Sequence, residues 1–174
     1  MFEKQYTPLK IVMYTLLGLV CYVCQSVAFP LFRFMGNAPE LLLVLAICVA
    51  FNESETFAAF FGLFAGFLCD VLTDTIVGKS ALFFMFAAFI ISILLRTMLR
   101  NLFTTYITTV LCALVVFLLL EYAFQSLFFG GIPFASALVR IILPKFFFTG
   151  VWAYPLYFIV KFMGKKLWQG GDNV

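Results

Sequence analysis

The chain has 174 residues, of which 65% are hydrophobic and only 11% are charged. Soluble domains carry roughly 25% charged residues, so this composition excludes an ordinary water-soluble domain. The formal net charge of +3 is too small and too scattered along the chain to favour nucleic-acid binding. We therefore expect a single integral-membrane domain over residues 1–174 that contacts the lipid bilayer and no nucleic acid.

Apolar stretches follow one another along the whole chain. A membrane-spanning helix needs about 20 mostly apolar residues, with a range of about 17 to 25. In chain order, we predict spans at residues 11–30, 39–51, 56–75, 80–96, 106–129 and 141–161. The expected fold class is therefore all-α, a polytopic membrane bundle of six transmembrane helices.

The second of these stretches is the shortest. Its sequence LLLVLAICVAF ends at the polar run from Asn52 to Glu55, which suits the N-terminal cap and first turn of the next helix. We expect the second and third segments to form a helical hairpin. The second segment is either a short tilted span or a re-entrant segment, and a re-entrant segment would leave five spans.

The positions of the cations predict the orientation of the chain. With six spans both termini share a side, and seven of the eleven Lys and Arg residues fall on it. The positive-inside rule places that side in the cytoplasm, so we expect both termini to be cytoplasmic. The seven are Lys4, Lys10, Arg96, Arg100, Lys161, Lys165 and Lys166, and the other four are Arg33, Lys79, Arg140 and Lys145.

The third segment carries small and acidic residues at helical spacing. Gly62, Gly66 and Asp70 recur every four residues and therefore lie on one stripe, with Asp74 a further turn on. Glycines on such a stripe allow close approach of another helix, and a carboxylate facing lipid would be costly. We expect this stripe to receive a partner's helix, while the alternative is that it packs the protein against itself.

The ionisable residues of the later spans share one depth. Counted from the cytoplasmic end at about 1.5 Å per residue, Asp70 lies about 21 Å along its helix and Glu121 about 24 Å along its own. We expect a polar cluster in the outer half of the bilayer that either pairs internally or contacts a partner or ligand. Its candidate members are Asp70, Asp74, Lys79, Glu121, Arg140 and Lys145.

The sequence contains no pattern that indicates catalysis. It has no histidine, and therefore lacks the commonest general base near neutral pH. We find neither a phosphate-binding glycine loop nor a set of metal ligands, and Asp70 and Asp74 lie on one helix rather than facing each other. We expect no enzyme activity, no cofactor and no metal.

Four short patterns along the chain are informative when they are taken together. Pro39-Glu40-Leu41-Leu42-Leu43 opens the second span, and Gly62-x-x-x-Gly66-Phe67-Leu68-x-Asp70 occupies the third. Gly78-x-x-Ala81-Leu82 follows the next turn, and Pro155-Leu156-Tyr157-Phe158 lies in a last span that ends with basic residues. Together these patterns resemble the rod shape-determining protein MreD family. The acidic turn from Asn52 to Glu55 departs from the usual family loop.

The resemblance implies a non-enzymatic role in the bacterial cell-elongation complex, at the inner (cytoplasmic) membrane. It implies a bitopic MreC-like partner and, directly or indirectly, a RodA-type glycosyltransferase and a class B penicillin-binding transpeptidase of peptidoglycan synthesis. It also implies a fold similar to the substrate-binding S-components of energy-coupling-factor transporters. A vitamin-binding S-component is the alternative function, although the outer loops are short and apolar.

Overall fold

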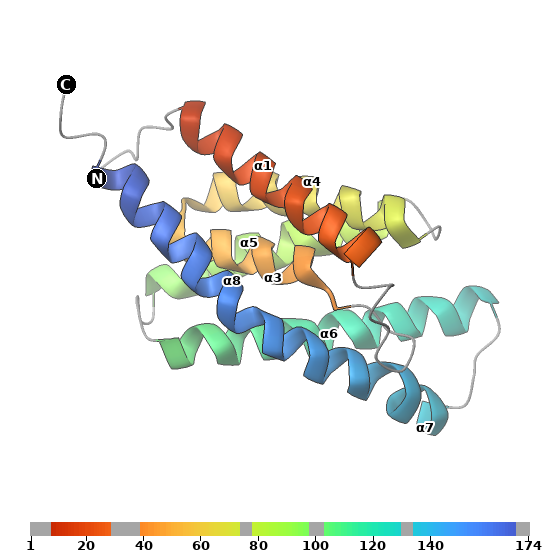
Figure 1. The fold of residues 1–174 in the computed structure, drawn as a ribbon. Coiled ribbons are helices and arrows are strands. Elements are labelled where there is room, and N and C mark those ends of the chain that lie inside the picture. The colour runs from red at the N-terminus through yellow and green to blue at the C-terminus, as the bar shows by residue number, and fades with distance from the viewer. Residues whose placement is uncertain (1–7, 29–38, 74–77, 98–102, 130–133, 170–174) are drawn as a thin grey trace.

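The computed structural model describes residues 8–28, 39–73, 78–97, 103–129 and 134–169 (Figure 1). These residues are helical almost throughout, and none of them lies in a β-strand. The expected all-α membrane bundle is therefore confirmed. In chain order the elements are α1 (Pro8–Val23), the π-helical turn η1 (Cys24–Ala28), α3 (Leu41–Asn52), α4 (Glu55–Thr73), α5 (Lys79–Thr97), α6 (Phe103–Phe129), α7 (Phe134–Ala137), the π-helical turn η2 (Leu138–Ile142) and α8 (Leu143–Gln169).

Six helical stretches correspond to the six predicted segments, and the ends of the first five lie within three residues of the prediction when η1 is counted with α1. The largest difference is at the last segment, where α7, η2 and α8 together run from Phe134 to Gln169 rather than over 141–161. Among the described residues, three helical stretches are long and apolar enough to cross a membrane, at Lys10–Val27, Thr105–Phe124 and Leu143–Phe162. The apolar helical stretches Leu41–Asn52 and Lys79–Leu94 are shorter.

Helix α3 is the centre of the bundle. Every residue from Leu41 to Ala50 is buried, because this helix is apolar on all its faces and such a helix belongs in a core. It contacts α1, α4, α5, α6 and α8. Its 12 residues extend only about 18 Å, which is less than the roughly 30 Å hydrocarbon core of a bilayer. The second predicted segment is thus a short helix enclosed by protein, where it meets little or no lipid.

The helical hairpin of α3 and α4 is present in the structure. The two helices pack together and are joined by Glu53 and Ser54. The Glu53 N–H donates to the Val49 carbonyl at the end of α3, and the Ala58 N–H donates to the Ser54 carbonyl at the start of α4. The polar run therefore ends one helix and begins the next, as its residue types predict.

The first and the last helix of the described chain begin and finish, respectively, on the same side of the bundle. In Figure 1 the first turn of α1 and the last turn of α8 lie at the left, whereas α4 and α6 end at the right. We call the left end, which also holds the α3–α4 turn, the terminal end, and the right end the distal end. An even number of crossings predicts this arrangement of the termini.

Candidate functional site: a charged network at the distal end

The glycine stripe of α4 packs against α5 of the same chain. A Cβ added at Gly62 would lie 2.5 Å from the Phe84 carbonyl oxygen, and one at Gly66 would lie even closer to the Ser80 carbonyl. Two helix backbones can approach this closely only where a side chain is missing. A partner's helix cannot occupy the stripe while α5 fills it. The expectation that this stripe receives a partner is therefore corrected in favour of packing within the chain.

Asp70 is also used within the chain. Its side chain is buried, and its carboxylate accepts hydrogen bonds from the backbone N–H groups of Gly78 at 2.8 Å, Ser80 at 3.0 Å and Ala81 at 3.2 Å. The first N–H groups of a helix have no partner inside that helix, and a carboxylate is the favoured acceptor for them. Asp70 on α4 therefore caps the start of α5. Gly78 has a φ of +99°, a backbone conformation that favours glycine in the turn before this cap.

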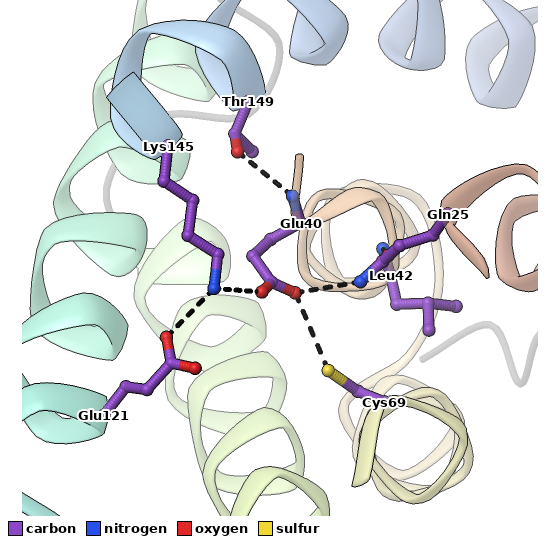
Figure 2. Close-up of polar contacts among 7 residues, drawn as sticks. All are labelled: Gln25, Glu40, Leu42, Cys69, Glu121, Lys145 and Thr149. Carbon is purple, nitrogen blue, oxygen red and sulfur yellow. Dashed lines mark hydrogen bonds and ion pairs between the residues drawn. The ribbon is translucent and has the colours of Figure 1, made fainter. Parts of the chain in front are cut away.

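The distal end contains a second and larger polar arrangement, which we call the Glu40 network. Figure 2 shows the polar contacts of this network, in which residues of η1, α3, α4, α6 and α8 gather around Glu40. Its residues are Gln25 of η1, Glu40 and Leu42 at the start of α3, Cys69 of α4, Glu121 of α6, and Lys145 and Thr149 of α8.

Three charged groups form the core of the Glu40 network. The Lys145 ammonium lies 2.6 Å from a Glu40 carboxylate oxygen and 3.0 Å from a Glu121 carboxylate oxygen. The side chains of Glu40 and Lys145 are 4% and 12% exposed, while that of Glu121 is 25% exposed. Charges removed from water are costly unless they are paired at close range, and these distances provide that pairing. The ion pairs hold α3, α6 and α8 together.

Uncharged groups complete the contacts of Glu40. The Gln25 amide nitrogen donates to the Glu40 carboxylate at 3.2 Å, and the Cys69 thiol lies 3.6 Å from the same oxygen. The Gln25 amide oxygen accepts the Leu42 N–H at 3.3 Å, and the Thr149 hydroxyl accepts the Glu40 N–H at 3.1 Å. Side chains of η1 and α8 thus satisfy backbone donors at the start of α3.

A smaller cluster lies at the terminal end. The Tyr14 hydroxyl donates to a Glu53 carboxylate oxygen at 3.2 Å, and the Lys10 ammonium lies 3.9 Å from that oxygen. Tyr14 is fully buried between the rings of Phe57 and Phe61. The acidic turn therefore ties α1 to the α3–α4 hairpin, which gives Glu53 a structural role.

The predicted outer cluster is found only in part. Glu121 and Lys145 are paired, whereas Asp70 is held by the backbone at the start of α5, where Lys79 is the first residue. Asp74 and the side chain of Arg140 lie outside the described residues. No sequence pattern predicted Gln25, Cys69 or Thr149 as members of a site, and Glu40 was noted only as part of a family pattern. A carboxylate directly before a helix that is apolar on every face was a usable signal, since such a helix carries it into the core.

The buried polar atoms of the described side chains are satisfied within the protein. Every buried side-chain nitrogen or oxygen among them has a hydrogen-bond partner. Within the same part of the chain, no group of three or more Cys, Asp or Glu side chains is arranged to hold a metal ion. The contacts of the Glu40 network thus join helices of the same chain to one another.

Comparison with known proteins identifies the family. The sequence model described as rod shape-determining protein MreD matches residues 5–167, which is nearly the whole chain. Searches of curated proteins and of solved structures gave no match. The match includes every helix described above except the last two residues of α8. The chain therefore belongs to the MreD family of rod shape-determining proteins.

Proposed function

We propose that this protein is a non-enzymatic membrane scaffold of the bacterial cell-elongation complex. The family match over residues 5–167 is the observation that carries the proposal, because it assigns the chain to proteins that determine rod shape. The internal use of the buried polar groups supports it, since they bind one another and the backbone of the same chain. A protein of this kind acts through the partners that it holds.

The proposed partners are a bitopic MreC-like protein and, directly or through it, the wall-synthesis enzymes. These enzymes are a RodA-type glycosyltransferase and a class B penicillin-binding transpeptidase. In this proposal the bundle is a rigid body in the membrane against which a single-span partner packs, so that the partner's position supports peptidoglycan synthesis.

The surface of the bundle suits that role. Large apolar side chains are exposed along α1, α5, α6 and α8, among them Val12, Leu16 and Val20 of α1 and Val116 and Leu120 of α6. In a membrane such faces meet lipid or another helix, and their exposure is not costly there. Helix α1 therefore leaves an aliphatic face open to a partner, unlike the glycine stripe that α5 covers.

We further propose that the protein is multi-pass in the cytoplasmic membrane with both termini in the cytoplasm. The larger number of cations on the terminal side supports this orientation through the positive-inside rule. The common location of the start of α1 and the end of α8 agrees with an even number of crossings. The Glu40 network would then lie toward the outer side of the membrane.

Affinity purification from native membranes tests the proposal. The protein carries a small C-terminal tag, the membranes are gently solubilised, and mass spectrometry identifies what is retained. We expect an MreC-like bitopic protein and wall-synthesis enzymes, at levels well above those with an unrelated polytopic protein carrying the same tag. Recovery of paired ATPases and a coupling membrane subunit would instead identify a transporter component.

A further inference from the structure

Helix α8 is longer than the apolar span that it contains. The span ends at Phe162, whereas the helix continues to Gln169. The seven further residues extend about 10 Å, at about 1.5 Å per residue. The hydrocarbon core of a bilayer is about 30 Å thick and the whole bilayer about 40–45 Å, so each headgroup layer is about 5–7 Å deep. The last two turns of α8 therefore pass through the headgroup layer at the terminal end.

These turns carry positive charge and no acidic residue. We call residues 161–169, with the sequence KFMGKKLWQ, the basic end of α8. Lys161 lies at the boundary of the span, and Lys165 and Lys166 follow it within about 8 Å along the helix. Lys165 and Trp168 come four and seven residues after Lys161, which places all three positions on one face of the helix. Tryptophan is enriched at the same level of other membrane proteins.

The charge of Lys161 is not neutralised within the described chain. Its side chain is exposed, and its ammonium donates to the Tyr157 hydroxyl at 3.2 Å and lies 5.1 Å from the centre of the same ring. Tyr157 is an uncharged partner. Among the described residues, no carboxylate lies within ion-pair distance of Lys161, whereas Lys10 and Lys145 are both paired with glutamates. The Tyr157 side chain thus holds a cation that can still pair with an anion.

We propose that the basic end of α8 binds the phosphate groups of anionic phospholipids. The helix continues directly from the span and holds its lysines at the depth of the lipid phosphates, which favours a lipid over an acidic protein as the occupant. Attraction to an anionic membrane surface strengthens binding roughly fivefold for each basic residue near it. Such a site does not depend on the proposed partners of the protein.

The fluorescence of Trp168 tests which lipid lies beside the basic end of α8. Trp152→Phe leaves Trp168 as the only tryptophan of the chain, and this variant is the parent protein of the experiment. It is reconstituted in vesicles of equal parts phosphatidylglycerol and phosphatidylcholine. In one preparation only the phosphatidylglycerol carries brominated acyl chains, which quench tryptophan, and in the other only the phosphatidylcholine does. The two preparations together give the ratio of anionic to zwitterionic lipid beside Trp168.

Two variants of the parent protein separate the basic end of α8 from an effect of any single cation. The triple variant with Lys161→Gln, Lys165→Gln and Lys166→Gln removes the charge of the basic end. Lys79→Gln is the matched control, because Lys79 begins α5 at the distal end and also has no carboxylate within ion-pair distance in the described chain. Raising the salt concentration with the parent protein tests the charge without any further substitution, since exposed charges are screened by salt.

We expect phosphatidylglycerol to exceed phosphatidylcholine beside Trp168 by about fivefold or more at low salt, and this ratio to fall as salt is raised. Lys79→Gln should keep the ratio of the parent protein, and the triple variant should bring it close to one. Equal amounts of the two lipids beside Trp168 in the parent protein would overturn the proposal and favour an acidic protein as the partner of these lysines. A triple variant that keeps the preference for phosphatidylglycerol would overturn it as well.

Discussion

Lys145 shows how a single residue organises this membrane bundle. Its ammonium group is enclosed and lies between two carboxylates from two other helices. With both carboxylates ionised, the three groups carry a formal charge of −1. Removal of the ammonium would leave two like charges close together in a poorly solvated place, which is among the most destabilising changes a protein can undergo.

We therefore predict that Lys145→Met lowers the free energy of unfolding by about 3–5 kcal/mol. Replacement of all three groups, as Glu40→Gln, Lys145→Met and Glu121→Gln together, should recover part of this loss because no unpaired charge remains. Thermal unfolding in detergent, followed by circular dichroism, measures both effects. Lys161→Met is the matched control, since Lys161 is exposed on the same helix and its loss should change stability by about 0.5 kcal/mol or less. Equal melting temperatures for Lys145→Met and Lys161→Met would contradict the structural role of Lys145.

At the scale of the elements, the contact between α4 and α5 depends on two missing side chains. Gly62 and Gly66 face carbonyl groups of α5 at a distance that leaves no room for a methyl group. The cap from Asp70 fixes the start of α5 at the same contact. This pair of helices forms the most extensive packing between two helices of the described chain.

Gly66→Ala should accordingly destabilise the protein by several kcal/mol, because backbone rather than a flexible side chain must move. Gly150→Ala on α8 is the matched control, since its added Cβ would meet only a Leu111 methyl group at 3.6 Å. Alanine is the better helix former by about 1 kcal/mol, so this control should be neutral or slightly stabilising. The melting temperatures of the two variants are compared. A Gly66→Ala protein as stable as Gly150→Ala would show that α4 and α5 are not in close contact.

The helices themselves were largely predictable from the sequence, and their neighbours were not. Long apolar runs predict where such helices lie. The first five predicted segments agree with the described helices to within three residues when η1 is counted with α1, whereas the last helical stretch, from Phe134 to Gln169, is longer at both ends than the predicted 141–161. The same runs do not encode which faces meet. The stripe of Gly62 and Gly66 predicts close approach of a helix, and nothing in its spacing tells a neighbour in the same chain from a partner's helix.

The short segment at 39–51 illustrates the same limit. The short length of this segment predicted an unusual span. Its central position depends on the helices that pack around it, which its own sequence does not specify. Only part of the Glu40 network was predictable from the sequence. Glu121 and Lys145 were expected at one depth, and Thr149 lies one turn beyond Lys145 on the same face. Gln25 and Cys69 join them through contacts between distant segments, which sequence spacing does not reveal.

At the scale of the whole molecule, the chain belongs to the rod shape-determining MreD family and has the form of an all-helical membrane bundle. Its buried polar groups are used to fix helices at both ends, through the Glu40 network at the distal end and through Glu53 at the terminal end. Its outward faces remain apolar. In the proposed function, such a molecule influences wall synthesis through the positions of the partners that it holds.

Depletion of this protein in its own host tests that role most directly. Cell shape is followed by microscopy, together with incorporation of a labelled wall precursor along the cell. We predict that cells lose their elongated shape and that incorporation is no longer confined to its normal sites, while a plasmid copy carrying Glu121→Gln restores both. Depleted cells that keep their shape and their normal pattern of wall synthesis would contradict the proposed function.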